Sequence, residues 1–302
     1  MKYLNILIAI LGLLSAAPSS AFAKVNIFAC APEWAALSEE IGGDLVEIYT
    51  ATRAQQDVHH MRAKPSLLTA MRKADLVFCS GASLEIGWLP VLLQKSGSPD
   101  VQQNTMGWFM AADFVKKIGV MEHAEHSMGH IHPEGNPHVH LNPHNILDIA
   151  DALTERLFLI DQANGKKYDE NYSTFKTKWQ QAITSWETQA ADLKGKNIVV
   201  YHRSWAYLTD WLGLNIITAL EPKPGLPPTT AHLEKLLKKL KDKDVKAILV
   251  APYENDNAAK WLSKHSNIPV LHLPYTIGGS EYADTLEHLF NETITKLGQN
   301  AQ

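Results

Sequence analysis

The stretch KKYDENYSTFKTKWQQAITSWETQAADL, residues 166–193, determines how the rest of the chain is organised. A helix of about 28 residues is about 42 Å long at 1.5 Å per residue, which is longer than one small domain requires. We therefore expect this helix to lie along two lobes; a long surface helix of one domain is the alternative. The pattern behind this expectation is a set of apolar and aromatic residues at the three-and-four spacing of an amphipathic helix, namely Tyr168, Tyr172, Phe175, Trp179, Ile183, Trp186, Ala190 and Leu193.

Short apolar runs alternate with helical patterns on both sides of this stretch. The alternation predicts an α/β fold of two lobes, each a parallel sheet flanked by helices, joined by one long rigid helix. We assign 24–163 to an N-terminal lobe that contains a histidine-rich loop (121–136), 164–194 to the linker helix, and 195–302 to a C-terminal lobe. The predicted strands are 25–29, 46–50, 76–79, 198–201, 215–219, 247–251 and 269–273. The predicted helices are 33–41, 67–73, 84–93, 143–160, 205–211, 232–241, 257–265 and 280–296.

The first 23 residues have the features of a secretory signal peptide. Lys2 supplies a positive start, residues 6–14 are apolar, and Ala21-Phe22-Ala23 is a small-x-small cleavage site. The apolar run is too short to cross a bilayer. No cysteine stands at the cleavage point, so we expect no lipid anchor. We therefore expect a soluble periplasmic protein that begins at Lys24, functions as a monomer and has no stable membrane insertion.

The charge balance argues against nucleic acid as a partner. The formal net charge is −4 at pH 7, and no basic stripe or basic amphipathic helix marks the chain. The two cysteines, Cys30 and Cys79, each end a short apolar run. If those runs are neighbouring parallel strands, a disulfide is expected in an oxidising compartment, with two buried free thiols as the alternative.

Histidine is concentrated in one part of the chain. Seven of the fourteen histidines fall between His123 and His144. Imidazole is the commonest protein ligand for late first-row divalent metals, so we expect a metal site that includes His138. The loop histidines before it have two interpretations, a mobile collector of zinc or a solvated loop that binds metal only loosely. They are His123, His126, His130 and His132.

Two more histidines occupy loop positions of the same kind as His138. His59 follows the second predicted strand, and His202 follows the first predicted strand of the C-terminal lobe. Ligands bind at the carboxyl ends of the strands in open α/β sheets. Two lobes that face each other with these edges would bring the three imidazoles into one cleft.

At this point the sequence resembles a known family, the ZnuA/TroA-like periplasmic metal-binding proteins of ABC importers. The resemblance runs from Lys24 to near the C-terminus and implies two α/β lobes joined by one rigid helix. It also implies capture of Zn²⁺ and delivery to a membrane permease, with His59, His138 and His202 as metal ligands. The resemblance rests on the following residues: His59 with Pro65-Ser66, Asn136-Pro137-His138-Val139 with Pro143, Tyr201-His202 with Trp205 and Tyr207, Trp211-Leu212-Gly213-Leu214, Glu221-Pro222-Lys223-Pro224-Gly225, and Leu273-Pro274-Tyr275 with Gly278-Gly279.

The chain departs from the family pattern at the fourth metal ligand. Some members supply a carboxylate from the last lobe, where this chain has no Asp or Glu in 271–275. Others place a Glu before the first ligand, where this chain has Val58; the tryptophan and aspartate common after the second ligand are His140 and Asn142. The fourth position is therefore open, and the candidates are water, His60, His140, Glu221 and a loop histidine.

Ligand type and placement also separate the possible functions. Three neutral nitrogens without an evident carboxylate suit zinc, whereas manganese prefers harder oxygen donors; copper also binds imidazole, and the resemblance favours zinc. Three histidines plus water would also serve a zinc hydrolase, but no His-Glu-x-x-His helix and no evident general base are present. A metal-storage or chaperone protein that acts through the loop is a third possibility.

Overall fold

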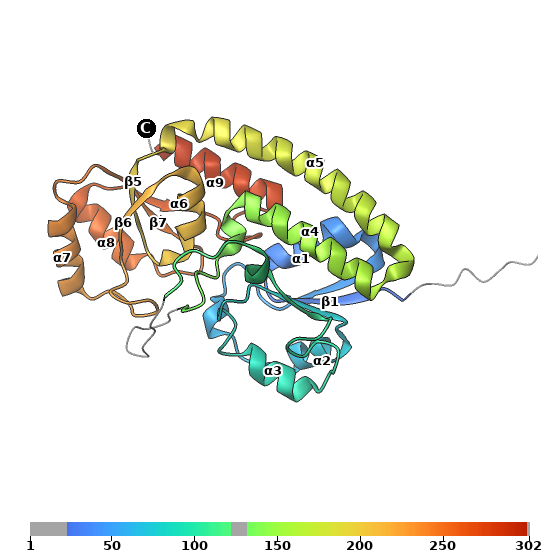
Figure 1. Ribbon diagram of the computed structural model, residues 1–302. Helices are drawn as coiled ribbons and strands as arrows, with labels where there is room; N and C mark the ends of the chain where they lie inside the picture. Colours follow the sequence, from blue (N-terminus) through green and yellow to red (C-terminus); the bar gives the residue numbers. More distant parts are fainter. Residues whose placement is uncertain (1–22, 122–131, 301–302) are drawn as a thin grey trace, which may run out of the picture.

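Two four-stranded sheets of parallel strands form the framework of the chain (Figure 1). The computed structural model describes residues 23–121 and 132–300. The expected signal peptide lies outside this part of the chain in its residues 1–22. The same holds for three histidines of the loop, His123, His126 and His130. None of the helices within the described ranges combines the length and apolar character that crossing a bilayer requires.

The N-terminal lobe is built on a sheet of order β2-β1-β3-β4. Both faces of the sheet are covered by helices, which is why its central strands, VNIFA and LVFC, are almost continuously apolar. Helices α1, α4 and α5 pack on one face, and α2 and α3 pack on the other. The bounds are β1 (Val25–Ala29), β2 (Val46–Thr50), β3 (Leu76–Cys79), β4 (Trp108–Met110), α1 (Pro32–Gly42), α2 (Pro65–Lys73), α3 (Leu89–Ser96) and α4 (Pro143–Ile160).

The C-terminal lobe repeats this strand order as β6-β5-β7-β8. Helices α7 and α8 cover one face of the sheet, while α6 and α9 face the core that is shared with the first lobe. The bounds are β5 (Asn197–Val200), β6 (Asn215–Ala219), β7 (Val245–Val250), β8 (Val270–His272), α6 (Ala206–Leu212), α7 (Thr230–Leu240), α8 (Asn257–Ser266) and α9 (Leu286–Asn300).

Helix α5 (Gly165–Gln189) runs along both lobes, as Figure 1 shows. Its 25 residues correspond to a length of about 38 Å. Trp179 Nε1 donates to the carbonyl oxygen of Pro143, at the start of α4, with a separation of 2.8 Å. Trp186 Nε1 donates to Asn291 Oδ1 in α9 with a separation of 2.6 Å. The two-lobe α/β fold with one long helix is therefore confirmed.

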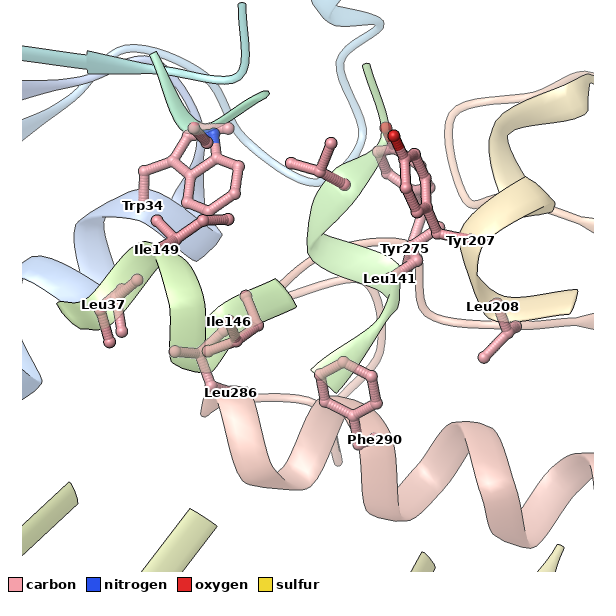
Figure 2. Packing of buried hydrophobic residues seen from close by; sticks show 14 of the residues in the cluster. Trp34, Leu37, Leu141, Ile146, Ile149, Tyr207, Leu208, Tyr275, Leu286 and Phe290 are labelled. Carbon is pink, nitrogen blue, oxygen red and sulfur yellow. The ribbon is translucent and has the colours of Figure 1, made fainter. Parts of the chain in front are cut away.

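The core is continuous between the two lobes. One cluster of buried side chains includes residues of both sheets and of α5. Figure 2 shows the part of this cluster where α1, α4 and α9 meet, with Leu37, Ile146, Leu286 and Phe290 pointing into common space. The two lobes therefore pack against each other through one continuous apolar core on the side of α5. This packing fixes the relative position of their sheet edges.

The structure differs from the sequence predictions at three elements. Residues 84–93 are not one helix: a turn that starts with positive φ at Ala82 and Ser83 continues to Trp88, and α3 begins only at Leu89. Strand β4 was missed because it has three residues and pairs only at the sheet edge. The final helix begins at Leu286 and not at residue 280.

Cys30 and Cys79 form a disulfide in the structure. They follow or end the neighbouring parallel strands β1 and β3, and their Cα atoms are 4.8 Å apart. Both residues are fully buried in the cluster between the sheet and helices α2 and α3. The disulfide therefore ties the carboxyl ends of the two central strands of the N-terminal lobe.

Candidate metal centre

The three histidines that the sequence pointed to meet between the lobes. His59 lies in a short 3₁₀ turn (Val58–His60) after β2, and His138 directly precedes the turn before α4. His202 follows β5 of the C-terminal lobe. The ring centroids of His59 and His138, of His59 and His202, and of His138 and His202 are 5.8, 5.7 and 5.8 Å apart. The imidazoles thus form a nearly equilateral triangle.

His132, one of the loop histidines, joins this triangle as a fourth imidazole. Its Nε2 lies 3.2 Å from His59 Nε2, and its ring centroid lies 6.2 Å from that of His138. The ligand atoms of His59, His132 and His138 all lie within 4.8 Å of one another. Two nitrogens on one tetrahedral zinc, each 2.0–2.1 Å from it, are about 3.3–3.4 Å apart. The spacing of His59 and His132 therefore suits a single small ion.

Carboxylates hold two of the imidazoles from behind. His59 Nδ1 lies 2.8 Å from Asp57 Oδ1, and His202 Nδ1 lies 2.7 Å from Glu221 Oε2. Because a carboxylate only accepts, each Nδ1 carries the proton and each Nε2 is left for a metal. Burial alone would raise the pKa of Asp57, but its hydrogen bonds and charge interaction with His59 lower it. Both carboxylates also offset the charge of a bound cation.

Neutral oxygens hold the other two imidazoles. His132 Nδ1 donates to the carbonyl oxygen of Ala82 at 3.1 Å. His138 Nδ1 lies 2.5 Å from the hydroxyl oxygen of Tyr275, which follows β8 in the C-terminal lobe. All four imidazoles are therefore held at Nδ1, which is the usual arrangement of histidines that bind metal through Nε2.

Asn136 connects two of the ligand segments. Its Oδ1 accepts from the backbone N–H of His138 at 3.0 Å, and its Nδ2 donates to the carbonyl oxygen of Arg203 at 3.0 Å. Arg203 is the residue after His202 and belongs to the other lobe. The asparagine therefore links the backbone at His138 to the backbone next to His202.

His138 is the most deeply buried member of the centre. It is 1% exposed, and its Nε2 has no hydrogen-bond partner among the described residues. Burial, followed by the proximity of His202 and His59, lowers the pKa of His138 well below its ordinary value. The residue is consequently neutral at neutral pH and has no proton to lose when Nε2 binds a metal.

The other candidates for the fourth position have different roles in the structure. His140 is buried, and its Nε2 donates to the carbonyl oxygen of Tyr275 at 3.0 Å. His60 has a side chain that is 59% exposed, with Nε2 3.6 Å from Asp57 Oδ2. Glu221 stands behind His202 and also accepts from the backbone N–H of Gly225. Of the described candidates, His132 is the one whose ring nitrogen enters the centre.

A cavity of about 180 Å³ lies beside His59 and His202. Burial raises the pKa of Glu254, one of its lining residues, to about 8. Glu254 Oε2 accepts from the backbone N–H of Ala251, at the end of β7. Most of the residues that line the cavity are polar, and they are Asp57, His59, His60, Tyr201, His202, Glu221, Gly225, Tyr253, Glu254 and Asn255.

Sequence reasoning missed three residues that shape the centre. Asp57 could have been found from its position two residues before His59, where an acidic side chain caps the short turn. Glu254 follows a strand at the same sheet edge, which is a usable signal. Tyr275 was noted only as part of a motif, because its partner His138 lies 137 positions away.

Comparison with protein families gives one match over most of the chain. The family model described as "ZnuA: Zinc-uptake complex component A periplasmic" matches residues 27–299. Among curated proteins, the manganese ABC transporter substrate-binding lipoprotein PsaA of Streptococcus pneumoniae is 24% identical over 241 residues, which cover 78% of this chain and 74% of that protein.

Solved structures with the same fold include proteins described with different metals. The crystal structure of ZnuA superposes with a TM-score of 0.75 at 20% identity, over 92% of this chain and 100% of that one. The S38A mutant of a manganese-bound periplasmic metal-binding protein from Candidatus Liberibacter asiaticus gives a TM-score of 0.74 at 20% identity, over 91% and 98% of the two chains. At this identity the likeness concerns the fold.

Proposed function

Because this chain belongs to the ZnuA family of periplasmic zinc-uptake components, we propose that it captures zinc between its lobes and delivers it to the permease of an ABC importer. It is a metal-binding, solute-binding component of an ABC transporter and not an enzyme. Zinc as the metal, the periplasm as the compartment and a cleaved signal peptide are parts of the proposal.

The observation that carries the proposal is the convergence of four imidazoles, each held at Nδ1. His59, His132 and His138 come from the N-terminal lobe, and His202 comes from the C-terminal lobe. Ligands from two lobes suit capture and release, because a shift of one lobe changes the number of ligands without unfolding either sheet. We therefore assign these four residues as the zinc ligands.

The donor set supports zinc over manganese. Four neutral nitrogens match the borderline-soft zinc ion and its tetrahedral geometry, whereas manganese prefers carboxylate, carbonyl and water oxygens. The carboxylates nearest the centre, Asp57 and Glu221, accept from imidazoles. The manganese named for relatives such as PsaA therefore does not carry over to this chain under the proposal.

The same donor set argues against a zinc hydrolase. A catalytic zinc keeps an open coordination position for water, while a structural or transported zinc is bound by four protein ligands. Under the proposal, four imidazoles would fill the tetrahedral positions and leave none for a nucleophilic water.

Metal titration of the mature protein tests the assignment. Zinc and manganese affinities should be measured by competition with a chelator for the unmodified protein and for His59→Ala, His132→Ala, His138→Ala and His202→Ala. We expect one tight zinc site, much weaker manganese binding, and a loss of zinc affinity of more than about 100-fold in each variant, which exceeds the usual effect of removing a residue behind a ligand.

His288→Ala is the matched control, because His288 is an exposed histidine paired with Asp284. It should leave the affinity unchanged. Hydrolysis assays with the zinc-loaded protein should show no turnover. A tight site that survives in all four ligand variants but disappears when residues 122–131 are deleted would instead support metal storage by the loop.

A further inference from the structure

Tyr275 reaches from the C-terminal lobe into the ligand segment of the N-terminal lobe. It is 5% exposed. Its hydroxyl oxygen lies 2.5 Å from His138 Nδ1, and its carbonyl oxygen accepts from His140 Nε2 at 3.0 Å. Its ring meets both imidazoles edge-on, with centroid separations of 5.7 and 4.9 Å. One residue therefore contacts both histidines of the His138–His140 segment.

The hydrogen bond to Tyr275 can form with either tautomer of His138, because a hydroxyl both donates and accepts, so the surroundings of Nε2 separate the two forms. A proton on Nε2 would be a buried donor without a partner among the described residues, which is unfavourable because the lost hydration of the N–H group is not replaced. A proton on Nδ1 is instead donated to the Tyr275 hydroxyl oxygen. Only this second form leaves the Nε2 lone pair available to a metal.

Of the four described imidazoles of the centre, His138 alone takes its Nδ1 acceptor from the opposite lobe. His59 uses Asp57 and His132 uses Ala82, all within the N-terminal lobe. His202 uses Glu221 within the C-terminal lobe. The orientation of His138 consequently depends on how the two lobes are placed.

The segment that carries Tyr275 is anchored to the N-terminal lobe by its next residues. The hydroxyl of Thr276 donates to the buried carboxylate of Glu33 in α1. Gln55 Nε2 donates to the carbonyl oxygen of Gly278 at 3.1 Å. These contacts hold the tyrosine in place independently of its own hydroxyl, so removing that hydroxyl need not displace the segment.

From this geometry we infer that Tyr275 is a positioning residue for zinc binding: its hydroxyl sets the tautomer of His138 and makes the affinity of the centre depend on contact between the lobes. The inference rests on the proposed zinc function. When the lobes are in contact, His138 presents Nε2 to the ion. When Tyr275 moves away, the proton of His138 is no longer held on Nδ1. Nε2 of His138 is then no longer oriented toward the metal position.

Tyr275→Phe tests this role while keeping the ring and its packing. Zinc affinity of the mature protein should fall about 10- to 100-fold, which is the usual effect of removing a group that orients a metal ligand. Tyr207→Phe is the matched control. Tyr207 is also buried, and its hydroxyl accepts from the backbone N–H of Ile118 across the lobes at 3.3 Å without touching a ligand. It should change the affinity less than about twofold if the effect is specific to positioning.

The tautomer can be measured without metal by ¹⁵N NMR of the histidine rings. In the unmodified protein the unprotonated nitrogen of His138 should be Nε2, and Tyr275→Phe should shift this ring toward a mixture of tautomers. In a His138→Ala background, Tyr275→Phe should cause no further loss of zinc affinity.

Two results would overturn the inference: an affinity within about twofold of the unmodified protein in Tyr275→Phe, against the 10- to 100-fold loss expected of a positioning residue, or a proton on Nε2 of His138 in the unmodified protein. A protein that binds no zinc would refute the proposed function, and the NMR result would still decide the role of Tyr275. If Tyr275→Phe does not fold, as judged by circular dichroism, the measurement on the unmodified chain remains decisive.

Discussion

Each imidazole of the centre is defined by the group that its second nitrogen contacts. His59 and His202 have carboxylates there, His132 has a carbonyl oxygen, and His138 has a hydroxyl. The carboxylates contribute negative charge as well as orientation to the ring that they hold. The residues behind the ligands are therefore expected to influence affinity in different degrees.

Glu221→Gln should weaken zinc binding about tenfold. The amide oxygen can still accept from His202 Nδ1, so the loss reports the missing negative charge rather than a missing hydrogen bond. Chelator competition at constant pH measures the effect. The exposed Glu47→Gln removes the same charge elsewhere and should have no effect; equal affinities in both variants would contradict the role given to Glu221.

Glu85 offers a second test at this scale, one that concerns stability. Burial raises the pKa of Glu85 from 4.5 to about 7, although its carboxylate accepts from the backbone N–H groups of Ser80 and Gly81. The folded state therefore binds this proton more tightly than the unfolded chain does. The resulting stabilisation is present below about pH 4.5 and is lost as the pH rises to about 7, a change of about 3 kcal/mol.

The comparison that checks this expectation is urea unfolding of the unmodified protein and of Glu85→Gln between pH 4.5 and 7.5. The difference in unfolding free energy between them should shift by about 3 kcal/mol in favour of the variant as the pH rises. Glu47→Gln serves again as the exposed control. A difference that does not vary with pH would show that Glu85 does not titrate in this range.

The proposed ligands could be predicted from the sequence where they follow a predicted strand. His59 and His202 occupy such positions, and the motif around His138 added the third. His132 was one of several histidines in a loop, and nothing local distinguished it. Its position depends on the carbonyl oxygen of Ala82, 50 residues away. Ala82 lies in a turn with positive φ values that the sequence pattern did not predict.

Among the elements, α5 contributes most to the relation between the lobes. Its apolar stripe was readable because the helical period is local, and the structure ends the helix at Gln189, four residues before the predicted end. Strand β4 could not be predicted in this way, because its three residues form a strand only through their pairing with β3. Periodicity thus predicts long elements and fails for short ones that tertiary contacts define.

Trp186→Ala should lower the unfolding free energy by about 3–5 kcal/mol. The indole is 1% exposed, packs on Phe290 with a ring centroid separation of 5.0 Å, and donates to Asn291. Denaturant unfolding followed by circular dichroism gives the change. Gln181→Ala, at an exposed position of the same helix, should stay within about 0.5 kcal/mol; similar values for the two variants would contradict the packing role of α5.

For the whole molecule, the order of strands and helices was predictable from alternation, while the facing of the two lobes was not. The parallel sheets follow from short apolar runs separated by amphipathic helices. The relative placement of the lobes follows from one core that both share, and from contacts such as that of Thr276 with Glu33, which are 243 positions apart. No local pattern encodes such pairs.

Zinc should stabilise the molecule as a unit, because its ligands come from both lobes. At free zinc about 100 times the dissociation constant, the gain is about 2.7 kcal/mol, which raises the melting temperature by roughly 5–10 °C. Differential scanning calorimetry with zinc and then with excess EDTA measures it. His202→Ala should reduce the shift, since the remaining imidazoles belong to one lobe; an undiminished shift would place the ion elsewhere.

The repeated strand order of the two sheets also has a consequence for symmetry. Cys30 and Tyr201 are counterparts, since each follows the first strand of its lobe and donates its backbone N–H to the third, at Phe78 and Leu249 respectively. The next residues, Ala31 and His202, are therefore related by the internal repeat. Only the second copy has an imidazole at this position, so repetition of the scaffold does not repeat the site. The candidate metal centre therefore includes a residue at which the two lobes differ.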